Sequence, residues 1–168
     1  MRAGLELGTR VAIVDDLVVA ERFYAEILGG EVFGNGSVDT RYMLSTDEFL
    51  EGQRRGAARA SGNGHDDFWV NRPPHSNCTV GAAKVSLYLA DRHIQEPPPE
   101  QLRGAPRLAI SATPEQIERA VAVLGRHGVP FEGPQDHATP CPVARSLYFR
   151  DPAGNFLELC CPRGGDKA

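Results

Sequence analysis

The chain has 168 residues, a formal net charge of −4 and a hydrophobic fraction of 41%. This size is enough to bury the core of one domain, and the weakly acidic balance gives no support for nucleic-acid binding. No apolar run reaches the roughly 18 residues that span a bilayer, and the first residues lack the apolar centre of a signal peptide. We therefore expect a cytoplasmic protein that has neither a nucleic-acid partner nor a membrane anchor.

The first half of the chain contains an apolar strand at 10–13 and a helix at about 20–27. The apolar residues at helical spacing are Ala20, Phe23, Tyr24 and Ile27. Segment 46–78 has little apolar periodicity apart from residues 68–70. We interpret it as a long insertion with one short strand at most, forming either a lid or a disordered surface loop. A further strand is expected at 84–89.

The second half repeats this order after a proline-rich connector at 95–100, which cannot form a central strand. Arg-Leu-Ala-Ile at 107–110 repeats the Arg-Val-Ala-Ile of 10–13. A helix then begins at Thr113, where Gln116 completes a capping box, and Gly128 ends it. The chain therefore reads twice as a strand, a helix and further strands.

The segment 146–160 encodes a hairpin around the turn Asp-Pro-Ala-Gly-Asn at 151–155. Side chains alternate between the faces of a strand. Leu157 and Leu159 therefore lie on one face, while Phe156, Glu158 and Cys160 share the other. Tyr148 on the preceding strand accompanies Glu158, so this face is expected to be polar.

The hairpin sequence, Tyr-Phe-x-Asp-Pro-x-Gly-Asn followed by an apolar residue and Leu-Glu-Leu, resembles the last strands of the vicinal oxygen chelate superfamily. That superfamily includes glyoxalase I, extradiol dioxygenases, and fosfomycin and bleomycin resistance proteins. The resemblance implies an α+β fold in which two βαβββ modules form a curved mixed sheet around a cup, with helices on the outer face. We expect one domain over 1–168, with module 1 at about 7–94, its insertion at about 46–78, and module 2 at about 105–162.

Metal-dependent members of the superfamily supply a histidine near the start of each module's first strand and a glutamate on a last strand. Glu158 matches the glutamate, but the histidine positions are occupied by Arg10 and Arg107, and a guanidinium offers no lone pair to a cation. The module 1 position that matches Glu158 is Ser86 or Tyr88. We therefore expect no cofactor. The alternative is one divalent ion (Zn, Ni, Mn or Fe) held by Glu158 in a rearranged metal site.

The side chains expected to bind a ligand in the cup are Arg10, Arg107, Tyr88, Phe156 and Cys160. Alternation places Val11, Ile13, Leu108 and Ile110 against the helices and both arginines on the side of Glu158. Guanidinium groups there suit a carboxylate, phosphate or enolate. The alternative is that one arginine pairs with Glu158 for structural reasons while the other lies at the solvent end of its strand.

The catalytic candidates are Glu158, His137 and Tyr148. Glu158 can act as a general base, and His137 can act as a base or join Glu158 at a metal ion, unless it is an exposed loop histidine. We predict a small-molecule-binding protein, a homodimer, that holds an anionic or aromatic metabolite or drug without the usual metal. The alternatives are a metal-dependent lyase, isomerase or dioxygenase, and a protein whose cup serves only assembly.

Overall fold

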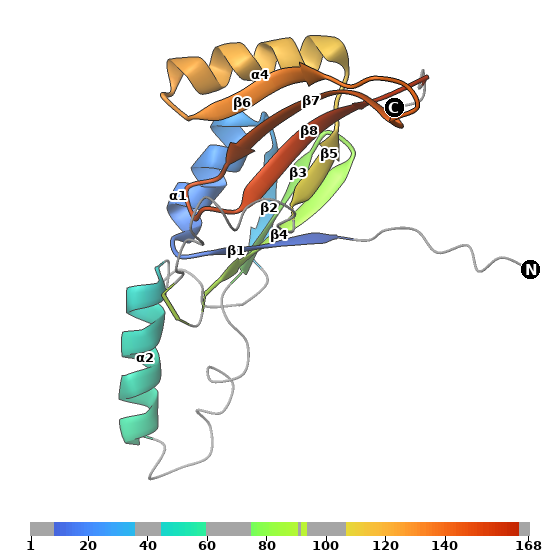
Figure 1. Cartoon of the computed structure of the whole chain (residues 1–168). Helices are drawn as coiled ribbons and strands as arrows, with labels where there is room; N and C mark the ends of the chain where they lie inside the picture. The colour runs from blue at the N-terminus through green and yellow to red at the C-terminus, as the bar shows by residue number, and fades with distance from the viewer. Residues whose placement is uncertain (1–8, 36–44, 60–74, 91, 94–106, 165–168) are drawn as a thin grey trace, which may run out of the picture.

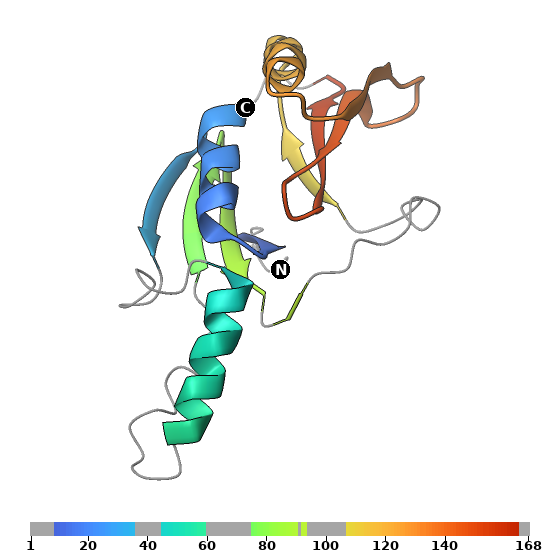
Figure 2. The ribbon, with the colours of Figure 1, turned by 90° about the vertical axis from the view of Figure 1, so that its left-hand side faces the viewer.

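A computed structural model describes residues 9–35, 45–59, 75–90, 92–93 and 107–164. These residues form an α+β fold of two four-stranded mixed sheets, each with a helix against one face (Figures 1 and 2). Each sheet comes from one half of the chain, so the structure confirms the two βαβββ modules. None of the described helices is both long and apolar enough to cross a bilayer.

Sheet one has the strand order β1-β4-β3-β2 and sheet two the order β5-β8-β7-β6. Sheet one consists of β1 (Arg10–Val14), β2 (Glu31–Asn35), β3 (His75–Val80) and β4 (Ala83–Leu89). Sheet two consists of β5 (Leu108–Ser111), β6 (Phe131–Asp136), β7 (Val143–Arg150) and β8 (Phe156–Pro162). In both sheets the first strand pairs in parallel with the last strand, and the other pairs are antiparallel.

The helices beside the sheets begin at side-chain caps. Asp16 accepts a hydrogen bond from the Val19 backbone at the start of α1 (Leu17–Arg22), which continues as the π-helical η1 (Phe23–Ile27). Thr113 and Gln116 form the predicted capping box at the start of α4 (Pro114–Arg126). The caps fix where each helix begins, directly after β1 or β5, and so align it with its sheet.

One hydrophobic core extends through both modules. On β7 and β8 the buried apolar residues are Leu147, Phe149, Leu157 and Leu159, which confirms the apolar face predicted for the hairpin. On sheet one the predicted faces of β1 are wrong. Ala12 and Val14 are buried, while Val11 and Ile13 are 53% and 45% exposed. Both residue sets are apolar, so composition alone does not decide which set faces the core.

Strand register explains this error. Val11 pairs with Ser86, as Ala109 pairs with Glu158, so the repeat aligns Val11 with Ala109. The sequence match of Arg10 to Arg107 is therefore off by one residue, and Thr9 lies at the position that matches Arg107. A one-residue slip reverses every side chain of a strand. Leu108 and Ile110 remain partly or fully buried, as predicted.

The segment predicted as an insertion contains α2 (Thr46–Arg59) and most of β3. The start of α2 is anchored by the buried Phe49 and by Thr46, whose hydroxyl donates to the Ala90 carbonyl at 3.3 Å. The rest of α2 extends away from the two sheets (Figure 2). Few apolar residues are needed to anchor one helix end, so the periodicity that identifies a helix was weak here. Residues 68–70 lie outside the described residues.

The hairpin turn joins the two modules. Asp151, which is 4% exposed, accepts a hydrogen bond from the Tyr24 hydroxyl at 3.2 Å. Asn155 donates from Nδ2 to the Ile13 carbonyl of β1 at 2.8 Å and also to Asp151. The rings of Phe23 and Phe149 pack beside this junction. Burial raises the pKa of Asp151, although its hydrogen bonds oppose the shift.

Candidate functional site

Glu158 is the buried carboxylate on the side of sheet two that faces away from α4, which we call the open face. It lies on β8 between Tyr148 of β7 and Ala109 of β5, and only 6% of its surface is exposed. An ionised carboxylate in this position requires hydrogen-bond partners. The surrounding residues supply them to both of its oxygens.

Arg107 and Ser146 each hold one oxygen of Glu158. The Arg107 Nε donates to Oε2 at 2.6 Å, and the fully buried Ser146 hydroxyl donates to Oε1 at 2.8 Å. Arg107 directly precedes β5, and Ser146 lies on β7 diagonally across from Glu158. The carboxylate is therefore neutralised by one cation and oriented by one hydroxyl.

His137 extends this series of hydrogen bonds. Its Nε2 lies 3.0 Å from the Ser146 Oγ, and its backbone N–H donates to the Ala144 carbonyl. The one hydroxyl proton of Ser146 points at Glu158, so the histidine nitrogen must donate to Ser146. This assigns the proton of His137 to Nε2. Sequence reasoning placed His137 near the site but missed Ser146, whose signal was only that it shares the face of Tyr148.

Aromatic rings border the ion pair on the same face. The rings of Tyr148 and Phe156 stack with centroids 6.0 Å apart. The Arg107 guanidinium lies 5.6 Å from the Tyr148 ring centroid, and that of Arg150 lies 5.7 Å from the Phe156 centroid. Each ring therefore carries a cation over its face, as cation–π pairs do. The result is an aromatic wall, formed by Tyr148 and Phe156, with a guanidinium over each of its two rings.

Cys160 lies two residues beyond Glu158 on the same face. Burial and the nearby Glu158 charge raise the pKa of its thiol, and Arg10 opposes this shift. The thiol contacts the Ile110 carbonyl at 3.7 Å. Cys160 is therefore a neutral thiol on this face, and Arg10 of β1 lies close enough to oppose the rise of its pKa.

The matching place on sheet one has different chemistry. Ser86 donates to Asn77 Oδ1 at 2.6 Å, and Tyr88 stacks on His75 with ring centroids 4.5 Å apart. Among the described residues, the contacts of Tyr88 do not join it to Glu158. The structure thus gathers Arg107, His137, Tyr148 and Phe156 around Glu158 and leaves Tyr88 in a separate polar cluster. No contact between Arg10 and Glu158 is described.

The donors around Glu158 do not fit a divalent cation. One carboxylate oxygen faces a guanidinium, and the other accepts from a hydroxyl. Within the part of the chain that the structure describes, no three His, Cys, Asp or Glu side chains gather closely enough to hold a metal ion. A tetrahedral or octahedral site needs more donors than Glu158 alone supplies. The arrangement suits an anion beside Arg107 better than a cation beside Glu158.

Comparison with known proteins identifies the wider group. The family model of the Glyoxalase/Bleomycin resistance protein/Dioxygenase superfamily matches residues 7–159. No curated protein gives a significant match. Many solved structures share the fold.

Three solved structures illustrate this similarity. A glyoxylase/bleomycin resistance protein/dioxygenase domain from Frankia sp. EAN1pec has a TM-score of 0.63 at 20% identity, over 96% of each chain. The fosfomycin resistance protein FosX from Listeria monocytogenes has a TM-score of 0.60 at 15% identity, over 98% of this chain and 97% of that chain. A FosX variant complexed with Mn(II) and 1S,2S-dihydroxypropylphosphonic acid has a TM-score of 0.60 at 14% identity, over 98% of this chain and 95% of that chain. At these identities the similarity shows the fold alone.

Proposed function

The chain belongs to the Glyoxalase/Bleomycin resistance protein/Dioxygenase superfamily, and from this premise we propose that it binds a small aromatic anion on the open face of sheet two. The negative group lies against the Arg107 guanidinium, and the ring lies along the wall formed by Tyr148 and Phe156. Binding requires no metal ion. A similar fold in FosX is described with a phosphonic acid, which is also a small anion.

The observation that carries this proposal is the geometry of Arg107. Its Nε is committed to Glu158, while 42% of its side chain remains exposed. No hydrogen bond from its terminal amino groups is found among the described residues, so those groups are available to an oxyanion. Glu158 therefore positions the guanidinium, and the exposed amino groups give it the bidentate geometry that carboxylates and phosphates prefer.

Binding of benzoate and phenylphosphonate, measured by isothermal titration calorimetry, tests the proposal. We expect Arg107→Gln to lower the affinity for both anions by about tenfold or more, since a charge-assisted hydrogen bond is lost. The matched control is Arg150→Gln, which removes a second guanidinium from the same face and should have the smaller effect. Failure of both anions to bind, or equal affinity in wild type and Arg107→Gln, contradicts the proposal.

The second candidate function is an enzyme that uses Glu158 as a general base. The observation in its favour is the hydrogen-bonded series in which His137 donates to Ser146 and Ser146 donates to Glu158, which orients the carboxylate as a general base requires. Under this hypothesis Glu158→Gln abolishes turnover while binding remains. Under the binding-protein hypothesis the ligand is recovered chemically unchanged after long incubation with the protein.

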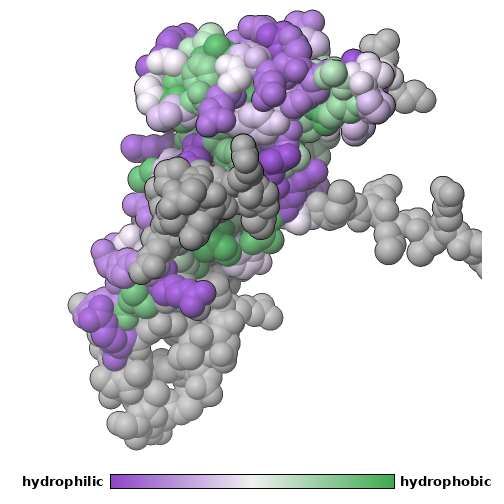
Figure 3. Space-filling view, viewed as in Figure 1, coloured by the Kyte–Doolittle hydropathy of each residue, from purple (hydrophilic) through white to green (hydrophobic). Residues whose placement is uncertain are grey.

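We further propose that the protein forms a homodimer. Val11 and Ile13 project from β1 on the opposite face from the buried Ala12 and Val14 and are about half exposed. A hydrophobic area lies over β1 in the space-filling view (Figure 3). Exposed apolar patches on a folded domain often mark interfaces, and these two residues are the first place to test for one.

A further inference from the structure

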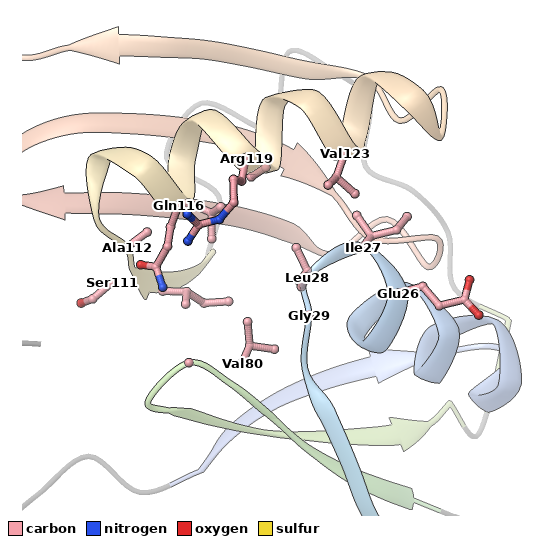
Figure 4. Close-up of a pocket in the computed structure, with 14 residues that line it drawn as sticks. Glu26, Ile27, Leu28, Gly29, Val80, Ser111, Ala112, Gln116, Arg119 and Val123 are labelled. Carbon is pink, nitrogen blue, oxygen red and sulfur yellow. The ribbon is translucent and has the colours of Figure 1, made fainter.

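A pocket of about 360 Å³ lies between the two modules, on the opposite side of sheet two from Glu158. It is bounded by the end of η1, the turn between β3 and β4, the end of β5, and α4 (Figure 4). Leu159 and Ile110 form part of its floor. They neighbour Glu158 and Ala109 in sequence and point to the other face of the sheet, so this pocket is separate from the proposed anion site.

Glycine residues keep this pocket open. Gly29 and Gly81 both line it, and their positive φ values of 67° and 58° are a conformation that favours glycine. At both positions no atom lies within 4 Å of where a Cβ would be. Gly30 packs so closely that an added Cβ would lie 2.5 Å from the Thr79 carbonyl oxygen. The chain after η1 therefore lies directly against β3, and Gly29 and Gly81 place no side chain in the space beside them.

The lining is mostly apolar and has one positively charged end. Leu28, Val80 and Val123 point into the space from three different elements (Figure 4). Arg119 and Gln116 reach toward one end from α4, whereas Glu26 lies at the other end. An apolar chamber with a few convergent polar groups, at the junction of two structural units, is typical of small-molecule sites.

The two polar side chains at that end retain unused donors. Gln116 accepts the capping hydrogen bond through Oε1, which leaves its Nε2 amide free of that bond. In the described part of the chain, Arg119 makes no hydrogen bond or close ion pair, and its charge interacts with that of Glu115, one turn earlier on α4. A carboxylate has the charge and the two acceptor oxygens that a guanidinium and an amide recognise together.

We propose that this pocket binds a monocarboxylate with an apolar body, its carboxylate between Arg119 and Gln116 and its apolar part against Val80, Val123 and Leu159. The carboxylate lies away from Glu26, which disfavours a ligand that is negative at both ends. The volume lies within the range of pockets that hold drug-sized molecules, about 300–1,000 Å³. This site adds a second ligand to the protein and does not depend on the anion site of Glu158.

Octanoate and its uncharged analogue octanamide are the probes. Isothermal titration calorimetry should show octanoate binding, with octanamide weaker by about tenfold or more, since charge-assisted hydrogen bonds exceed neutral ones. Arg119→Gln should remove this preference for the charged probe. Val123→Trp fills the chamber and should abolish binding of both probes, while far-ultraviolet circular dichroism checks that each variant is folded.

The control variant is Arg107→Gln, which alters the open face of sheet two and should leave octanoate affinity within about twofold, as expected for an independent site. Amide chemical shifts of Gly29 and Gly81 should move on addition of octanoate to the wild-type protein, which locates binding even if Val123→Trp fails to fold. Loss of octanoate binding in Arg107→Gln alone assigns the probe to the other site and overturns the proposal. So does unchanged affinity in Arg119→Gln, or no octanoate binding.

Discussion

Ser146 and Ser86 are two buried serines in different environments. Ser146 donates to the buried Glu158 carboxylate, whereas Ser86 on β4 of sheet one donates to the neutral Asn77 side chain on β3. A hydrogen bond to a charged group contributes more to stability than one between neutral groups. Comparing the stability lost when each serine is replaced by alanine therefore measures how much the Ser146 hydroxyl stabilises the Glu158 charge.

We predict that Ser146→Ala lowers the free energy of unfolding by about 1.5–3 kcal/mol, and that Ser86→Ala lowers it by about 0.5–1.5 kcal/mol. Urea titration followed by circular dichroism gives both values. Equal losses in the two variants contradict a stabilised carboxylate at Glu158.

Strand alternation predicted much of the site at the level of single residues. It placed Tyr148, Phe156 and Cys160 on the face of Glu158, and the structure confirms these positions. It did not identify Ser146 as a partner, because a serine on a strand carries no signal of what its hydroxyl meets. The pairing of Arg107 with Glu158 was one of two alternatives, since the register of β5 against β8 is not contained in either strand alone.

At the scale of elements, the effect of Asp151 protonation on stability can be tested in the turn between β7 and β8. Burial is the main cause that raises the pKa of Asp151 above its ordinary value. An acid whose pKa is higher in the folded state keeps its proton longer than the unfolded chain does. Its contribution to stability is therefore complete at low pH and is lost as the pH rises through the raised pKa.

We predict that the wild-type unfolding free energy minus that of Asp151→Asn falls as the pH is raised from about 4, where an unfolded aspartate titrates. Asparagine does not titrate, so the difference isolates Asp151. Urea titrations at a series of pH values check the slope. A difference that rises with pH would show that the hydrogen bonds from Tyr24 and Asn155 outweigh burial.

The helix α2 shows which kind of element could not be predicted from the sequence. The hairpin and α4 could be predicted from turn residues, strand alternation and a capping box, all of which are local signals in the sequence. For α2 the structure buries Thr46 and Phe49 at one end, and the helix sequence after Leu50 has only Ala57 and Ala58 as apolar residues. A helix that protrudes from the fold needs no stripe, so a polar helix and a polar loop look alike in sequence.

At the scale of the whole molecule, metal content separates the proposed metal-free anion site from the alternative of a rearranged metal site at Glu158. We predict that protein purified without chelators carries less than about one tenth of an equivalent of zinc, nickel, manganese or iron, because a guanidinium stands beside Glu158 and offers no lone pair. Elemental mass spectrometry measures this. Near-stoichiometric metal that disappears in Glu158→Gln would favour the rearranged metal site.

The proposed dimer is also tested on the whole molecule. We expect sedimentation equilibrium to give twice the chain mass of 18.2 kDa, and the doubly charged variant Val11→Asp/Ile13→Asp to sediment as a monomer. Both side chains are already about half exposed, so the substitutions should leave the fold intact. A wild-type monomer, or a dimer in both proteins, contradicts the proposed interface.

The turn at 151–155 has a consequence for how this chain is recognised. Asp151 and Asn155 form hydrogen bonds with Tyr24 and with β1. The residues that make this motif easy to recognise therefore connect the two modules of the protein. Glu158, which follows this turn on β8, faces a site to which Arg107 and His137 are contributed from outside the hairpin. A sequence signature of this kind reports assembly of the scaffold, and a protein can keep it unchanged while the chemistry beside it is replaced.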